Sequence, residues 1–158
     1  FYIYDCYRAS KASPSVHSAV IRSRPHFIPI AYPHDGNRRD SMGNPGLADQ
    51  YRNLGCNFLL EHFTNPPALG NNKGSNSIEE GLMAMLQAIE ADKFKVFSTL
   101  SDWFEEFRMY HRKDNKVVPL RDDLMSATRY AFQSQRYAVA GKDPAWTQDV
   151  EYRNYGII

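Results

Sequence analysis

The sequence predicts an α/β fold: a mixed, largely parallel sheet flanked by helices. Short apolar, β-prone segments alternate with segments of helical periodicity, which is the pattern of strands joined by crossover helices. The expected strands cover residues 1–7, 27–32, 57–63 and 94–97. With 42% hydrophobic and 13% aromatic residues, a chain of 158 residues can build one domain around one core.

Local end signals place the first two helices. Ser13 followed by Pro14 is typical of an N-cap and the first helical position, so a helix should run from there to about Arg24. Asn44-Pro45 predicts the start of a second helix, and Gly55 stands where a C-terminal glycine belongs.

A capping box, Ser77-Ile78-Glu79-Glu80, predicts the start of a third helix. Its apolar residues recur on one face at helical spacing: Ile78, Leu82, Met85, Leu86 and Ile89. A fourth helix should begin at Ser101 and bury Trp103, Phe104 and Phe107. Residues 109–118 then predict a β-hairpin around Asp114-Asn115, added to the main fold.

Composition excludes few functions. The net charge is +1, but residues 108–142 hold eight Lys/Arg against three Asp/Glu, while residues 78–106 hold two against seven. Such asymmetry is common on soluble surfaces. No run of 18 apolar residues is present, so we expect no membrane partner. Cys6 and Cys56 are expected to be free thiols rather than a disulfide or a zinc site.

The most informative feature is the run from Arg121 to Tyr130, in which Asp122 and Asp123 open an apolar helix that should reach about Gln135. One carboxylate can cap the helix while the other faces a cation. Asp35 follows the strand at 27–32, at the strand end where ligands gather in such sheets.

Two interpretations of these acidic residues stay open on the residues alone. Mg²⁺ is held by a few carboxylates and keeps several waters, so Asp35 with the acidic pair can form a metal site. Aspartate is also common in turns and at helix starts, which would explain each residue without any ligand.

The hairpin around residues 114–118 and the run of residues 122–130 resemble the end of the nuclease domain of bacteriophage large terminase subunits. The similarity is to headful-packaging terminases of short-tailed, lambdoid-type phages. That domain is ribonuclease H-like, related to integrases and resolvases. The resemblance covers residues 1–137, the expected nuclease core, and leaves residues 138–158 as a C-terminal tail.

The resemblance implies a metal-dependent endonuclease that cuts double-stranded DNA during genome packaging, using two Mg²⁺ or Mn²⁺ ions. It implies Asp35 and Asp123 as catalytic metal ligands, with Asp122 as the cap and the other candidate ligand. Ser126 stands where the family often has another Asp. The first catalytic Asp of the family lies on its first strand, whereas residues 1–7 resemble its third, so that Asp and two strands are expected upstream of Phe1.

Basic residues near these acids are candidates for phosphate contacts, which are independent of base sequence. They are Arg38 and Arg39 after Asp35, and Arg112, Lys113, Lys116 and Arg121 in and around the hairpin. The alternative is that they are solvated surface side chains. Arg129 and Tyr130 are expected to pack within the fold.

No phosphate-binding Gly-rich loop is present, so the resemblance implies an ATPase domain upstream in the full chain. Further expected partners are the small terminase subunit and the portal, with the tail aromatics Trp146, Tyr152 and Tyr155 as candidate portal contacts. The expected location is the host cytoplasm, transiently at the procapsid portal.

Two other functions remain open. A catalytically incomplete ribonuclease H-like DNA-binding or assembly module is favoured by Ser126 and by the lack of the first acid. A resolvase- or transposase-like nuclease would use the same metal chemistry on a different DNA; the hairpin argues against it by analogy only.

Overall fold

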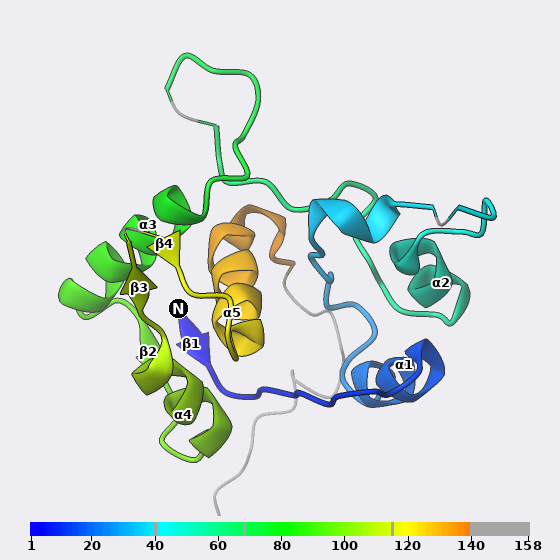
Figure 1. Cartoon of the computed structure of the whole chain (residues 1–158), viewed down its shortest axis with the longest axis horizontal. Helices are drawn as coiled ribbons and strands as arrows, with labels where there is room; N and C mark the ends of the chain where they lie inside the picture. Colours follow the sequence, from blue (N-terminus) through cyan, green and yellow to red (C-terminus); the bar gives the residue numbers. More distant parts are fainter. Residues whose placement is uncertain (40, 68, 115, 140–158) are drawn as a thin grey trace, which may run out of the picture.

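The computed structural model describes residues 1–39, 41–67, 69–114 and 116–139. In the view of Figure 1, helix α5 (Asp123–Gln133) lies between α3 (Ile78–Glu90) and α4 (Ser101–Met109) on one side and α1 (Pro14–Arg22) and α2 (Leu47–Asn53) on the other. The tail aromatics expected to meet the portal lie outside the described residues.

The strand that opens the chain is shorter than expected. Strand β1 (Tyr2–Ile3) pairs in parallel with β2 (Lys95–Val96), with Tyr2 opposite Lys95. The Lys95 N–H donates to the Phe1 carbonyl at 2.9 Å, and the Phe97 N–H donates to the Ile3 carbonyl at 3.0 Å. The segments expected as first and fourth strands are thus parallel neighbours, in agreement with the predicted largely parallel sheet.

The other two expected strands also lie side by side, but they meet in a single parallel bridge, between Ile30 and Phe58. The Ile30 N–H donates to the Asn57 carbonyl at 2.9 Å, and the Leu59 N–H donates to the Ile30 carbonyl at 3.0 Å. Pro29 has no N–H, so the ladder cannot be continuous here.

The ends of the first two helices follow their sequence signals in part. Helix α1 begins at Pro14 as predicted, although the Ser13 side chain makes no capping hydrogen bond. Helix α2 begins at Leu47 after Gly46, so the predicted start at Pro45 is wrong by two residues. Gly55 has φ +82°, the left-handed conformation expected of a glycine that follows a helix.

The capping of α3 is confirmed, because the Ser77 side chain accepts the Glu80 N–H at 3.3 Å. The apolar face of α3 is only partly in the core. Met85 is buried, whereas three other residues of that face are exposed: Ile78 at 45%, Leu86 at 45% and Ile89 at 38%. The helix predicted from this spacing is confirmed, but its apolar face is not fully buried.

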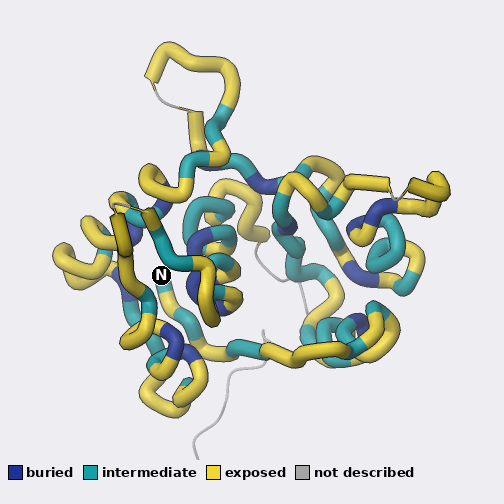
Figure 2. The backbone as a smooth tube through the Cα atoms, viewed as in Figure 1, coloured by how far each residue is buried: buried dark blue, intermediate teal, exposed yellow. Residues whose placement is uncertain are grey.

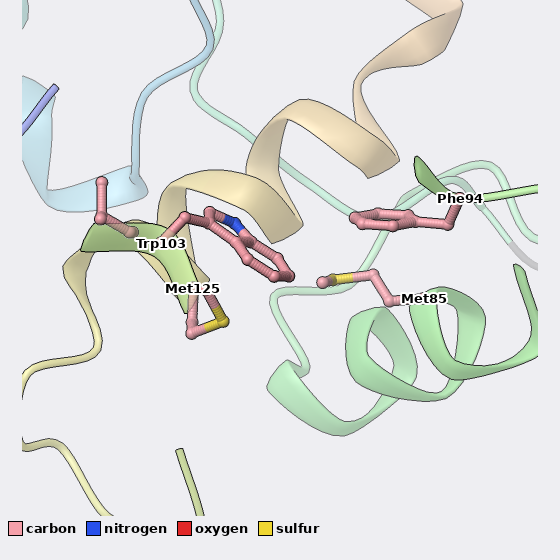
Figure 3. Close-up of a cluster of buried hydrophobic side chains, with 5 residues drawn as sticks. Met85, Phe94, Trp103 and Met125 are labelled. Atoms are coloured by element: carbon pink, nitrogen blue, oxygen red, sulfur yellow. The ribbon is translucent and has the colours of Figure 1, made fainter. Parts of the chain in front are cut away.

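The main hydrophobic core lies where α3, α4 and α5 meet, and it consists of Met85, Phe94, Trp103, Leu124 and Met125. Figure 3 shows the Trp103 indole between the Met85 and Met125 side chains. Figure 2 shows that burial on α5 is concentrated toward α3 and α4. Phe107 stacks on Trp103 but is exposed, contrary to its predicted place in the core.

The predicted hairpin is confirmed. Strand β3 (Arg112–Lys113) pairs antiparallel with β4 (Lys116–Val117), and Lys113 lies opposite Lys116. Both cysteines are free thiols. Within the described part of the chain, no helix is long and apolar enough to cross a membrane.

Candidate functional site

A cavity of about 1160 Å³ opens between the segment at 28–33 and helix α5. Most of its lining is apolar, from residues such as Ile28, Ile30, Phe58 and Ala131. Its polar lining residues include Asp35, Asp123, Ser126, Tyr130 and Ser134. Asp35 and Asp123, two carboxylates that are distant in the sequence, thus line the same cavity.

Asp35 lies in a 3-10 turn, η1 (His34–Asn37), directly after the bridged segment. The turn packs closely on Tyr32: a Cβ at Gly36 would lie 2.7 Å from the Tyr32 ring, so any other residue there would require the buried ring to shift. The Tyr32 hydroxyl lies 3.0 Å from Asn37 Oδ1 and 3.1 Å from the Leu60 carbonyl. The Asp35 carboxylate is therefore exposed on a turn whose backbone is held in place.

The N-terminus of α2 supports the same turn. Gly46 is buried, and a Cβ there would lie 2.7 Å from the backbone carbon of Asn37 and 2.8 Å from the Gly36 carbonyl oxygen. Arg52, in the last turn of α2, donates to the Tyr32 hydroxyl at 2.9 Å. Both ends of this short helix thus contact the structure that presents Asp35.

The other acidic residues lie at the start of α5. Asp122 occupies the N-cap position and Asp123 the first helical position. The Asp122 side chain makes no capping hydrogen bond, so the prediction that it caps the helix is wrong for the side chain. Its Oδ2 lies 3.4 Å from the Ser126 hydroxyl. Asp123 is exposed and faces the cavity together with Ser126.

Glu106 provides the missing cap. Its Oε1 accepts the Met125 N–H at 2.7 Å, and its Oε2 accepts from Arg8 Nη1 at 3.0 Å. The Glu106 side chain is 0% exposed. Sequence reasoning missed this residue, although an acid three positions after Trp103, on the same helical face, was an available signal.

Tyr110 lies close enough to Asp122 to respond to its charge. Burial raises the pKa of the Tyr110 phenol above its ordinary value of 10.0, and the negative charge of Asp122 raises that pKa further. Asp122 is therefore partly buried beside a neutral phenol, an environment unlike that of exposed Asp123.

Arg129 and Tyr130 pack within the fold, as predicted. The buried Arg129 guanidinium lies over the Phe63 ring at 5.3 Å and the Tyr130 ring at 4.7 Å. Its Nη1 has no hydrogen-bond partner among the described residues. Arg129 is therefore a packed side chain of the interior.

The basic candidates divide into two groups. Arg38 and Arg39 are exposed and follow the Asp35 turn directly. The remaining four lie in or near the hairpin, where two are already paired: Arg112 with Glu79, and Arg121 with Glu105 at 2.8 Å. Lys113 and Lys116 are exposed.

The donor chemistry of the site fits a hard cation. Among the described residues, no group of three or more His, Cys, Asp or Glu could hold a metal ion. Mg²⁺, however, takes oxygen donors and needs only one or two protein carboxylates, because it keeps its waters. Asp35 and Asp123 supply two such carboxylates to one cavity, and Asp122 is the sequence neighbour of Asp123.

Comparisons with known proteins agree on one family. A family model described as the terminase RNaseH-like domain matches residues 1–135. The large terminase subunit of Salmonella phage P22 is 35% identical over 144 residues, which are 90% of this chain and 28% of that protein. The large terminase subunit of Enterobacteria phage LP7 is 35% identical over 133 residues, 84% of this chain and 27% of that protein.

The solved structure of the P22 large terminase nuclease domain matches with a TM-score of 0.74 and 34% identity, covering 87% of this chain and 68% of that chain. The chain thus spans just over a quarter of the length of the curated relatives it matches. The expected ribonuclease H-like fold is confirmed. The chain belongs to the terminase RNaseH-like domain family and has the fold of a phage large terminase nuclease domain.

Proposed function

We propose that this chain is the catalytic part of a metal-dependent endonuclease that cuts double-stranded DNA when a phage head has been filled. The observation that carries the proposal is that Asp35 and Asp123 line the same cavity. Membership of the terminase family supports DNA as the substrate.

The residues of the site would divide the work as follows. Asp35 and Asp123 would hold Mg²⁺ or Mn²⁺, two ions in all. When bound, such ions activate water and stabilise the leaving oxygen of a phosphodiester. Arg38 and Arg39, exposed beside the Asp35 turn, would bind phosphate of the DNA backbone. The Ser126 hydroxyl, 3.4 Å from Asp122 Oδ2, would orient that carboxylate.

The expected first carboxylate has a place in this proposal. We expect a β-prone segment carrying an Asp upstream of Phe1, and the mostly apolar cavity beside residues 28–33 would receive it. The P22 nuclease domain contains more chain than matches here, since this chain covers 68% of it. Such a segment would bring a third carboxylate to Asp35 and Asp123.

The test is cutting of supercoiled plasmid by the full natural protein in Mn²⁺, with neutral variants of single acids. Asp35→Asn and Asp123→Asn should each lower the rate at least about 100-fold, because each removes a metal ligand. Asp92→Asn is the matched control, since Asp92 is exposed and its φ of +57° suits Asn equally well. Undiminished cutting by the Asp35 variant contradicts the proposal.

Asp122→Asn decides between the two acids of α5. Asp123 faces the cavity whereas Asp122 does not line it, so the Asp122 variant should lose less activity than the Asp123 variant. The reverse order would assign the metal to Asp122.

The hairpin lysines make a separate contribution in this proposal. Replacing both Lys113 and Lys116 by Gln should weaken DNA binding. It should also make the binding constant less dependent on salt, with the log–log slope falling by about one for each phosphate that a lysine no longer neutralises. Lys73→Gln, at another exposed lysine, is the control. An unchanged salt slope in the double variant would remove the hairpin from the DNA-binding surface.

A catalytically incomplete DNA-binding module is the second candidate, favoured by the lack of a three-residue metal cluster in the described ranges. It predicts DNA binding without cutting in every variant. The wider partners belong to the main proposal: an upstream ATPase domain, the small terminase subunit and the portal, meeting in the host cytoplasm at the procapsid.

A further inference from the structure

We infer that Glu106 is a positioning residue, which fixes the end of α5 where Asp122 and Asp123 lie. The inference rests on the proposed function, because it assigns Glu106 a role through those two carboxylates. Glu106 would contact neither DNA nor metal. Its effect would pass through the backbone of α5.

The first step is the unusual cap. The first N–H groups of a helix lack partners within the helix, and the N-cap side chain normally accepts from the second or third of them. Asp122 is in the N-cap position, but its side chain makes no such bond. The N–H of Met125, the third helical residue, donates instead to Glu106 of α4 at 2.7 Å.

The second step is that Glu106 cannot move away. Its side chain is 0% exposed, and its other oxygen accepts from Arg8 Nη1 at 3.0 Å. Hydrogen bonds to ionised groups are shorter and stronger than neutral ones. One turn earlier in α4 and one turn later in α5, Trp103 Nε1 donates to Thr128 Oγ1 at 2.9 Å in the interior. Helix α4 therefore holds α5 at two successive turns.

The cap from Glu106 leaves the carboxylates of Asp122 and Asp123 without a capping role. An aspartate that caps a helix turns its oxygen toward the helix N–H groups. Because Glu106 satisfies the Met125 N–H, neither Asp122 nor Asp123 needs to do so. Both carboxylates can therefore serve as ligands while the helix end stays ordered.

The experiment compares Glu106→Gln, Glu106→Ala and the control Glu90→Gln in the full natural protein. Glu90 is an exposed carboxylate on α3 and loses the same charge as Glu106 in its variant. Two quantities are measured: hydrogen–deuterium exchange of peptides covering residues 122–128 without metal, and the Mn²⁺ concentration that gives half-maximal plasmid cutting.

We expect Glu106→Ala to speed exchange at the start of α5 about 5- to 10-fold, since it removes a cap. We expect its half-saturating Mn²⁺ concentration to rise about 10-fold, as for other groups that orient metal ligands. Glu106→Gln should show smaller changes in both, because the Gln carbonyl can still accept the Met125 N–H. Cutting at saturating Mn²⁺ should recover, whereas general unfolding would lower it at every Mn²⁺ concentration.

The inference is overturned if both Glu106 variants match Glu90→Gln in exchange at residues 122–128 and in Mn²⁺ dependence. It is also overturned if the melting temperature alone falls. Failure of the proposed function has a different signature, namely unchanged cutting by Asp35→Asn and Asp123→Asn. If the Ala variant does not fold, the Gln variant carries the test with the same two readouts.

Discussion

The two sides of α5 differ in how they are held. Toward α3 and α4, Leu124 and Met125 are buried in the main core. Toward the 28–33 segment, Ala127 and Ala131 are exposed and line the cavity. The contrast shows that one helix can be fixed firmly from one side while its other side stays accessible, so that a carboxylate at its start is both ordered and exposed.

The largest expected effect tests the packed side. Leu124→Ala should lower the free energy of unfolding by about 2–5 kcal/mol, because it removes a buried side chain and leaves a cavity in the core. Ala131→Leu on the open side should change the free energy by no more than about 0.5 kcal/mol in the 158-residue chain. Urea denaturation of both variants measures the difference, and equal effects would contradict the contrast between the two sides.

A longer chain sharpens the same comparison. If an upstream segment fills the cavity, Ala131→Leu in a chain that includes that segment should cost about 1–3 kcal/mol, because the added side chain overpacks a filled space. Leu124→Ala should cost the same in both chains. An Ala131 variant that remains neutral in the longer chain would show that the segment does not pack against α5.

A smaller effect is expected at the contact between α4 and α5. Thr128→Val keeps the shape of the side chain but leaves the Trp103 indole N–H without its acceptor, so it should cost about 1–3 kcal/mol. Thr128→Ser keeps the hydroxyl and serves as the control. Thermal unfolding, monitored by tryptophan fluorescence, distinguishes the two variants. A Thr128→Val variant with unchanged stability would show that the bond does not hold the helices together.

The smallest effect concerns alkaline pH. The pKa of Tyr110, near the packed side, is raised by burial and by the charge of Asp122, and the pKa of Tyr51, in the cavity wall, is raised mainly by burial. Each folded phenol keeps its proton at a pH where the unfolded one, with a pKa of 10.0, has lost it. The free energy of unfolding should therefore fall as pH rises above 10.

Urea denaturation between pH 8 and about pH 11 checks this expectation, with the range set by the ordinary phenol pKa. Tyr110→Phe and Tyr51→Phe should each flatten the decline. If filling of the cavity buries Tyr51 further, the effect of Tyr51→Phe should be larger in the longer chain, whereas that of Tyr110→Phe should not change.

The last helix and the hairpin could be predicted because their signals are local. The acidic pair and the apolar spacing predicted α5 from Asp122 to about Gln135, and the helix runs Asp123–Gln133. The hairpin needed only a turn between two short β-prone segments. Neither prediction required knowledge of which distant segment packs on them.

The strands and the outer face of α3 could not be predicted in the same way. An apolar pattern shows that a face favours burial, but not whether a partner lies within the chain. Residues 1–7 therefore read as a strand, although only Tyr2–Ile3 pair. Leu86 fits the helical periodicity yet stays exposed.

The candidate site was also predictable only where its signals are local. Asp35 and Asp123 were identified by their places at the end of a strand and the start of a helix, and the resemblance joined them. Glu106 could not be assigned its cap from sequence, because the acceptor and the Met125 N–H belong to different helices. When the N-cap side chain itself makes no capping bond, as with Asp122, the tertiary structure decides which acid caps the helix.

The close approach of Gly46 to the Asp35 turn bears on how this domain can vary. Every substitution at Gly46 adds a Cβ within 3 Å of the Asn37 backbone, which cannot swing aside as a side chain would. In a saturation mutational scan selected on phage yield, Gly46 should therefore rank with the acidic residues of the site, although it has no side chain to do chemistry. Gly43, with nothing near its Cβ position, should tolerate more replacements, Asn among them.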